Sequence, residues 1–522
     1  MDAAPRPAPR PGDAGMTALP KSTPAATSWR ALEDRLDLVS PRLNPLRHLG
    51  AIAFLLFWIL VVTGIYLYVV IDTSVGGAYA SIDRLSRGPW GFGGLLRSVH
   101  RYAADLFALI TLAHLVREWV LGRFRGFAAS SWLTGVALLP LLAVSAIGGF
   151  WLNWDQLGQY SATASAEWLD WWPLFGAPLT RNFLVATAIS DRLFSLFVFV
   201  HIGVPLLMLF GFWFHLRRLA HVAVWPPRAL ATSLLLALLT MAAIVPVHSQ
   251  APADVAQVPA VLSIDWILLF VHPLVAATSA TAVWLAVLAV LAVLLSLPLL
   301  RAHARPAVAE VHARHCSGCR RCVADCPFDA ITMVSHPQRP GYALAQVDAD
   351  ACASCGICVG SCPSSTPFRS MATLVTGIDM PQQPIDGLRT ALRTRLATMD
   401  AAQRYVVFGC DHGTPVNAVE AHDVATFSLT CIGQLPPSFI EYALRDGASG
   451  VLIGTCPESG CAFRLGQRWT VERLAGARAP ILRSSVDAAR WDVVECRRTD
   501  ASILPAALAS LRRRVVEAGS CA

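Results

Sequence analysis

The stretch RSVHRYAADLFALITLAHLVREWV (residues 97–120) is long and apolar enough for a membrane-spanning helix, yet it contains two histidines. His100 and His114 are fourteen residues apart. At about 100° per residue, this spacing returns to within roughly 40° of the same helix face and rises about 21 Å. Polar side chains at membrane depth are costly and usually face the interior of a helix bundle. Because an isolated histidine is usually a structural one, a functional interpretation requires a partner elsewhere in the chain.

A second apolar stretch, DRLFSLFVFVHIGVPLLMLFGFWFHLRR (191–218), repeats the spacing with His201 and His215. If both helices run in the same direction, His100 shares one depth with His201, and His114 shares the other with His215. Imidazole ligands on both faces of an iron suit an electron-transfer haem. The quartet therefore predicts two bis-histidine sites, each for one haem b.

Small and basic residues near these histidines extend the pattern. The same spacing of fourteen separates two pairs of glycines, Gly50 with Gly64 and Gly135 with Gly149. Small residues let helices pack closely, but the shared period also predicts a gap for a flat macrocycle at each depth. Arg97 and Arg117 lie three residues from a histidine and are candidate partners of haem propionates, with anchoring at the membrane interface as the alternative.

Composition divides the chain into two halves. Of its 522 residues, 55% are hydrophobic and 15% are charged, and the cysteines lie after residue 315 while the long apolar runs lie before residue 300. Six apolar runs reach the roughly 20 residues that span a bilayer: 48–71, 95–120, 132–152, 190–217, 229–247 and 263–298. A membrane half therefore precedes a cysteine-rich half, and no aromatic-interleaved basic patch predicts a nucleic-acid partner.

Arginine-rich flanks predict the orientation of the chain. They precede the first run and follow the second, fourth and sixth runs, which places these ends in the cytoplasm. The tryptophan-rich connection between the third and fourth runs suits the outer interface. We therefore expect a multi-pass protein of the inner membrane with its N-terminus and cysteine-rich half in the cytoplasm.

Residues of about 45–300 resemble cytochrome b of the quinol-oxidising complexes. The resemblance rests on the histidine quartet, the glycine pairs, Pro205 and the sequence GFWLNWDQ. It implies that Asp265, in Ser263-Ile264-Asp265-Trp266, stands where the family has a glutamate that accepts a quinol proton. A carboxylate solvated at the membrane interface is the alternative, and a quinone site near Arg217, Arg218 and His221 at the inner haem is the competing location.

Two cysteine runs, CSGCRRCVADCP (316–327) and CASCGICVGSCP (352–363), follow the membrane half. Each has the spacing C-x2-C-x2-C-x3-C-P of two-cluster ferredoxins, in which the fourth cysteine of one run binds the other cluster. Disulfides and zinc suit this spacing and the expected compartment poorly. We expect two 4Fe-4S clusters, one held by Cys316, Cys319, Cys322 and Cys362, and the other by Cys352, Cys355, Cys358 and Cys326.

A third cysteine group lies at the ends of strand-like runs in a small α/β pattern, and consists of Cys410, Cys431, Cys456 and Cys461. Residues of about 403–470 resemble the delta subunit shared by methyl-viologen-reducing hydrogenase and heterodisulfide reductase systems. The resemblance implies a 2Fe-2S cluster on these four cysteines, with unliganded thiols as the alternative. Cys496 and Cys521 fall outside the pattern.

The expected fold class is multidomain, with an α-helical membrane bundle, an α+β ferredoxin domain and a small α/β iron–sulfur domain. The expected segments are a disordered leader (1–45), the dihaem bundle (46–222), two further helices (223–300), the ferredoxin domain (301–375), a linker (376–402) and the delta-subunit-like domain (403–522).

These features favour an electron-transfer subunit of a quinone-linked oxidoreductase complex. The sequence contains no motif for a nicotinamide, flavin, molybdenum or nickel site, so the cytoplasmic chemistry is expected in a partner. The delta-subunit resemblance implies a flavoprotein, a heterodisulfide-reductase-like protein, a hydrogenase or a formate dehydrogenase subunit. A membrane redox sensor without net turnover is the alternative function.

Overall fold

The computed structural model describes residues 24–37, 43–87, 91–173, 179, 189–217, 224–254, 256–257, 261–300, 307–365, 374–400 and 402–520. The chain divides into two compact units. The membrane unit comprises Leu36–Ser354, and the C-terminal unit comprises Cys355–Ala522 together with the segment that ends at Arg35. The division falls inside the predicted ferredoxin segment, between Ser354 and Cys355.

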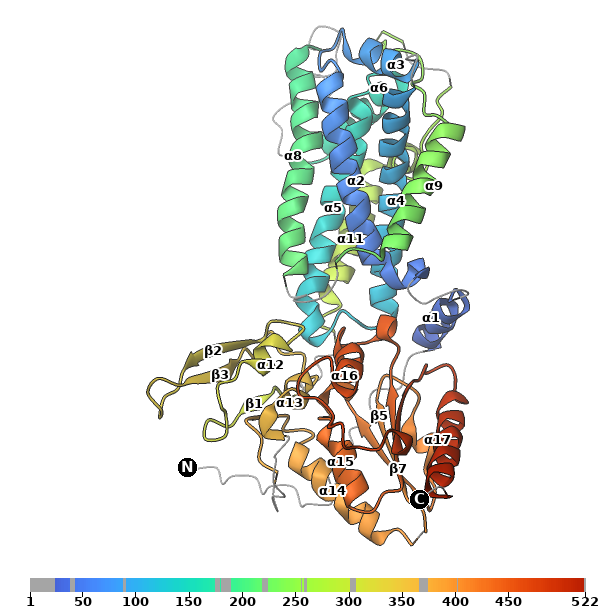
Figure 1. The fold of residues 1–522 in the computed structure, drawn as a ribbon. Coiled ribbons are helices and arrows are strands. Elements are labelled where there is room, and N and C mark those ends of the chain that lie inside the picture. The colour runs from blue at the N-terminus through green and yellow to red at the C-terminus, as the bar shows by residue number, and fades with distance from the viewer. Residues whose placement is uncertain are drawn as a thin grey trace. The chain divides into compact units, whose positions relative to one another are not determined.

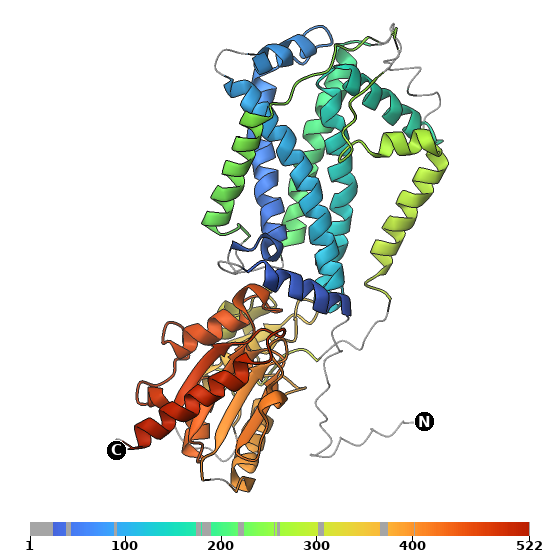
Figure 2. The same ribbon diagram turned by 90° about the vertical axis from the view of Figure 1, so that its right-hand side faces the viewer.

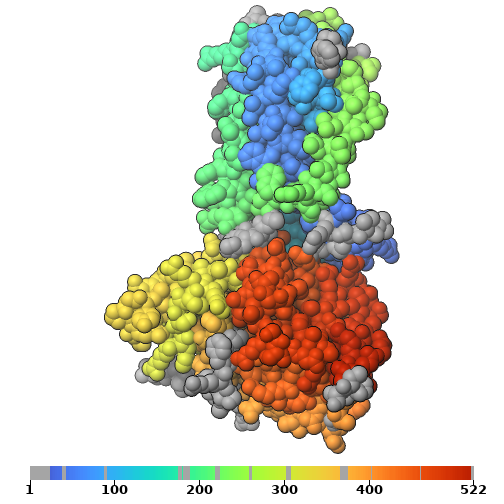
Figure 3. Space-filling view, viewed as in Figure 1, coloured from blue at the N-terminus to red at the C-terminus, as the bar shows by residue number. Residues whose placement is uncertain are grey.

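The membrane unit is built on long helices that lie side by side (Figures 1 and 2). They are α2 (Leu49–Val70), α4 (Phe92–Val120), α5 (Ala129–Trp151), α8 (Asp191–Leu216), α9 (Arg228–Ile244) and α11 (Ala280–Ser296). By length and composition, three of the described helical segments are able to cross a membrane: Pro45–Val70, Gly126–Trp151 and Asp191–Leu216. Helices α9 and α11 are shorter apolar helices. Exposed apolar side chains on the helical surface, part of which is visible in Figure 3, include Phe199, Phe210, Trp213 and Leu236.

The sixth apolar run is not the single helix that 263–298 predicts. A short helix, α10 (Val271–Ala277), precedes α11, and the two are separated at Thr278 and Ser279. Thr278 Oγ1 donates to the Leu274 carbonyl at 2.6 Å, and Ser279 Oγ accepts from the Ala282 N–H at 3.1 Å. Because these hydroxyls end one helix and cap the next, the run is broken although it remains apolar.

The helices of the bundle pack in pairs, α2 against α4 and α5 against α8. Between the two histidine depths lies an apolar core of Ile52, Ala53, Leu56, Phe57, Ala103, Phe107, Leu138, Met208 and Leu238. Two shorter helices, α3 (Ala78–Arg87) and α6 (Gln156–Leu169), lie at the same end of the bundle (Figures 1 and 2). We call this the α3/α6 end.

The membrane unit also contains the first half of the ferredoxin segment. Its elements are β1 (Glu310–Val311), α12 (Arg321–Ala324), β2 (Ile331–Ser335) and β3 (Ala343–Val347). Strands β2 and β3 pair antiparallel, with Ile331 opposite Val347. The short helix carries one predicted cluster ligand, Cys322, and a second, Cys326, follows it before strand β2.

The C-terminal unit is built on a four-stranded parallel sheet in the order β6-β5-β7-β8. The strands are β5 (Tyr405–Cys410), β6 (Val424–Leu429), β7 (Gly450–Thr455) and β8 (Trp491–Glu495). Every residue of β5 and β7 is buried, as expected for a parallel sheet covered on both faces. Helix α17 (Ile503–Ser520) covers one face, and α14 (Ile385–Thr398) and α15 (Ser438–Arg445) lie on the other (Figure 1). Other elements of this unit include β4 (Ile378–Asp379), α13 (Ile357–Gly360), α16 (Gly466–Leu474) and the 3₁₀ turn η6 (Ile432–Gln434).

Two segments that the sequence analysis treats as unstructured are helical. In the predicted linker 376–402, α14 buries Leu388, Leu392 and Leu396, which lie four residues apart on one helix face. In the predicted leader, α1 (Pro24–Arg35) forms in the C-terminal unit, where Asp34 accepts a hydrogen bond from Thr499. Both helices gain their stability from tertiary contacts, which weak local propensity does not reveal.

Candidate functional site

The structure brings His100 on α4 and His201 on α8 together at one depth of the bundle. Their ring centroids are 6.3 Å apart and their planes are inclined at 69°. Because a bond between imidazole nitrogen and a metal is about 2 Å long, this separation leaves space for one metal ion between the rings.

Hydrogen bonds determine which nitrogen of His100 and of His201 carries the proton. His201 Nδ1 lies 2.8 Å from the Ser145 carbonyl, which can only accept, so Nδ1 donates. His100 Nδ1 lies 2.9 Å from Thr63 Oγ1, whose own hydrogen is donated to the Ile59 carbonyl at 2.7 Å. Nδ1 of His100 therefore donates as well. Both Nε2 atoms keep the lone pair that a metal requires.

The second depth repeats this arrangement. His215 Nδ1 lies 3.2 Å from Thr134 Oγ1, which donates its hydrogen to the Ser130 carbonyl at 2.9 Å. Glu118, one helical turn further along α4, has its Oε1 at 3.9 Å from His114 Nδ1. The sequence analysis missed both threonines, although Thr63-Gly64 and Thr134-Gly135 form a repeated dipeptide that would have pointed to them.

Each of the four glycines lies against one of the four histidines. A Cβ atom added at Gly50, Gly64, Gly135 or Gly149 would lie 2.9–3.2 Å from Cε1 of His114, His100, His215 or His201, respectively. Such contacts are tighter than ordinary van der Waals contact, so a side chain here would displace the imidazole. The glycine period therefore matches the histidine period helix by helix, α2 with α4 and α5 with α8.

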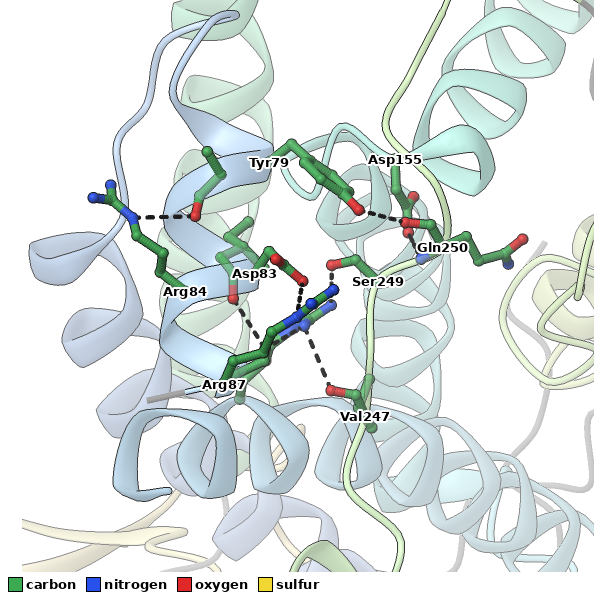
Figure 4. Close-up of polar contacts among 12 residues, drawn as sticks. Tyr79, Asp83, Arg84, Arg87, Asp155, Val247, Ser249 and Gln250 are labelled. Carbon is green, nitrogen blue, oxygen red and sulfur yellow. Dashed lines mark hydrogen bonds and ion pairs between the residues drawn. The ribbon is translucent and has the colours of Figure 1, made fainter. Parts of the chain in front are cut away.

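The two candidate propionate partners lie in different surroundings. Arg97 donates to four acceptors: Ser86 Oγ at 2.6 Å, Asn153 Oδ1 at 3.1 Å, Ser249 Oγ at 3.0 Å and the Val247 carbonyl at 3.4 Å. The adjoining network joins Tyr79 and Asp155 to the backbone of Gln250 (Figure 4). Arg117 is buried and donates to Glu118 Oε1 at 3.0 Å. Through its four hydrogen bonds, Arg97 links α4 to α3 and to the segments around Asn153 and Ser249 at the α3/α6 end.

Asp265 forms an ion pair with Arg101, the residue that follows His100. Its Oδ1 also accepts from the N–H groups of Ile267 and Leu268, at 2.9 and 2.7 Å. The carboxylate is only 13% exposed and is held at the α4 helix. At the competing quinone location, Arg217 lies over the Phe214 ring, while Arg218 and His221 lie outside the described residues.

The cysteines of the membrane unit lie among backbone N–H donors. The N–H of Ala330 donates to Cys326 Sγ at 3.3 Å, and the N–H of Ser354 donates to Cys352 Sγ at 3.4 Å. Burial, reinforced by the neighbouring Cys352, raises the pKa of the Cys326 thiol. Cys326 and Cys352, which the sequence assigns to one cluster, are therefore neighbours. N–H groups near the sulfurs are typical of iron–sulfur sites.

Four buried cysteines meet at the ends of the parallel strands in the C-terminal unit. Cys410 ends β5 and contacts Cys456, which follows β7, and Cys461 contacts both Cys456 and Cys431. Contact with Cys461 and complete burial raise the pKa of Cys431 well above its ordinary value. Cys496 lies apart, in the apolar core against α17, and burial raises its pKa to about 12. Cys521 lies outside the described residues.

In the part of the chain that the structure describes, no three side chains are already arranged as ligands of a single metal ion. A bis-histidine haem takes two protein ligands, and each iron of an iron–sulfur cluster takes one or two. Paired imidazoles and paired thiols are therefore the relevant geometry, and the residues present fit these groups.

Three family models match consecutive parts of the chain. Residues 36–223 match cytochrome b/b6/petB, residues 315–366 match the 4Fe-4S dicluster domain, and residues 409–519 match the delta subunit of methyl-viologen-reducing hydrogenase. A solved structure described as a hyperthermophilic respiratory Complex III is 19% identical. The similarity covers 48% of this chain and 74% of that chain, with a TM-score of 0.40. The family models confirm the three resemblances that the motifs indicated.

Proposed function

Because the chain joins a cytochrome b domain, a 4Fe-4S dicluster domain and a delta-subunit domain in one membrane electron-transfer subunit, we propose that it links a cytoplasmic oxidoreductase to the quinone pool. The bound groups would be one 2Fe-2S cluster, two 4Fe-4S clusters and two b haems, which together supply one-electron carriers from the cytoplasm to the membrane.

The observation that carries this proposal is the repeated histidine environment. At both depths an imidazole faces a glycine, and three of the four rings have Nδ1 bound to an oxygen acceptor that leaves Nε2 for iron. A histidine that only packs in a core needs neither the facing glycine nor the fixed tautomer. His100 and His201 would hold the outer haem, and His114 and His215 the inner one.

An aromatic contact supports a connection between the ferredoxin segment and the bundle within the membrane unit. Phe328, two residues after Cys326, packs against Phe127 with ring centroids 4.8 Å apart. Phe127 lies between α4 and α5, at the end of the bundle nearer His114 and His215. The ligand loop of one 4Fe-4S cluster would thus adjoin the inner haem.

The quinone site proposed here lies beside the outer haem, where Arg101 joins Asp265 to the helix that carries His100. Asp265 would exchange a proton with the quinone, and Arg101 would hold the carboxylate in place. The arginine flanks support an inner-membrane location with the iron–sulfur domains in the cytoplasm. The delta-subunit match supports a hydrogenase-related or heterodisulfide-reductase-related partner.

The test is the spectrum of the purified full-length protein. His114→Ala or His215→Ala is expected to remove the inner b-type haem and leave the outer one. His100→Ala or His201→Ala is expected to remove the outer haem and leave the inner one. The control is His272→Ala, because His272 is also buried in the bundle but contacts Ser161 and Tyr160 instead of another histidine. Two haems per protein after a quartet substitution would contradict the assignment.

A further inference from the structure

Arg473, on α16 of the C-terminal unit, is fully buried and is the largest such side chain among the described residues. Its Nη1 donates to the Gly433 carbonyl at 2.9 Å, and its Nη2 lies 3.5 Å from the Ile357 carbonyl. Gly433 follows Cys431 by two residues, and Ile357 lies between Cys355 and Cys358. One guanidinium therefore joins the loop of a predicted 4Fe-4S ligand set to the loop of the predicted 2Fe-2S set.

The two loops are packed so closely that glycine is required where they meet. A Cβ at Gly360 would lie 2.1 Å from the Gly433 carbonyl oxygen and 2.7 Å from Arg473 Nη1. A Cβ at Gly433 would lie 2.8 Å from Ile357 Cγ1. At Gly466, on the helix of Arg473, it would lie 2.2 Å from Cys431 Sγ. No room exists for another side chain between the loops.

The charge of Arg473 gives this contact an electrical consequence. A guanidinium stays protonated in proteins, and a buried charge is tolerated only when opposite charge or hydrogen bonds compensate for lost hydration. Cysteines that bind iron do so as thiolates, so both loops become negative when clusters are present. A fixed positive charge in a low-dielectric interior then favours the reduced, more negative form of each cluster.

We propose that Arg473 is a positioning residue that holds the Cys355–Cys358 loop against the Cys431 loop and raises the reduction potentials of both clusters. The inference rests on the proposed function, because it takes the cluster assignments as its premise. Arg473 lies outside the cysteine motifs, and its side chain holds the two ligand loops in contact.

The experiment uses the full-length protein with its clusters, and compares Arg473→Met with Arg473→Lys. The matched control is Arg468→Met on the same helix, because the Arg468 side chain is 57% exposed and pairs with Glu472. Iron and sulfide content are measured first. Redox titration followed by electron paramagnetic resonance then gives the reduction potential of each cluster and the magnetic interaction between them.

Arg473→Met is expected to shift both potentials to more negative values and to weaken the magnetic interaction, while Arg468→Met changes neither. Arg473→Lys keeps the charge but not the two-carbonyl contact, so the potentials should stay near wild type while the interaction weakens. Unchanged potentials in an iron-replete Arg473→Met protein would overturn the inference. If that variant loses iron, unchanged potentials and interaction in Arg473→Lys overturn it instead. A wild type without a 2Fe-2S signal would contradict the proposed function itself.

Discussion

Arg101 and Asp265 form an ion pair between α4 and the turn that precedes α10, although they are far apart in the sequence. Arg101 also bonds Asp105, one helical turn along α4. The candidate proton-exchanging carboxylate is thus attached to the helix of a predicted haem ligand. A carboxylate that was merely solvated at the membrane surface would not need this partner.

If Asp265 serves a quinone at the outer side, electrons from the cytoplasm cross most of the membrane to reach it. Transfer outward dissipates a potential that is positive outside, with about 2.3 kcal/mol available per charge per 100 mV. We expect an imposed potential to change the donor-to-quinone rate in proteoliposomes, and Asp265→Asn to slow that rate. Asp105→Asn is the control, because it removes another carboxylate that pairs with Arg101. If neither the imposed potential nor Asp265→Asn changed the donor-to-quinone rate, the quinone would be placed near the inner haem.

The threonines that accept from the histidines are expected to set haem potentials. Thr63→Val removes the acceptor of His100 Nδ1, and Thr134→Val that of His215. An imidazole whose N–H is hydrogen-bonded is a more basic ligand of iron. Loss of this hydrogen bond should therefore raise the reduction potential of one haem in each variant. Spectroscopic redox titration measures the shift. Thr232→Val, at an exposed position of α9, should shift neither potential.

Substitution of the delta-subunit-like cysteines is expected to remove an iron–sulfur cluster, whereas substitution of Cys496 is not. Cys431→Ser or Cys461→Ser should erase the 2Fe-2S signal and keep both 4Fe-4S signals, whereas Cys496→Ser should keep all three. The raised pKa of Cys496, about 12, means that its thiol is protonated at neutral pH and should be alkylated slowly. Loss of iron in the Cys496 variant would show that the ligand set is wrong.

Helix α14 is expected to be a structural part of the C-terminal unit. Leu392 is fully buried, so Leu392→Ala should lower the free energy of unfolding by about 2–5 kcal/mol. Thr394→Ala, on the exposed face of α14, should change it by less than about 0.5 kcal/mol. Both changes in the free energy of unfolding are measured by chemical denaturation of the full-length protein, monitored with a spectroscopic probe in the C-terminal unit. Equal effects would mean that 376–402 behaves as a linker.

The sequence by itself determined the features that depend on local spacing. The helix period puts His100 and His114, or Gly50 and Gly64, on one face, and the cysteine runs prescribe ferredoxin-like ligation. The first five apolar runs likewise predict the long helices to within a few residues, because burial of an apolar segment in a membrane needs no knowledge of its neighbours.

Only the tertiary structure decided which side chains meet across elements. The Thr63–His100 and Thr134–His215 hydrogen bonds, the Arg101–Asp265 pair and the Arg473 bridge each join different elements, and these contacts depend on which helices and loops are neighbours. Tertiary packing also made α14 a helix, since a polar segment with three leucines is stable only against a core. The break at Ser279 followed from hydroxyl caps that the apolar pattern concealed.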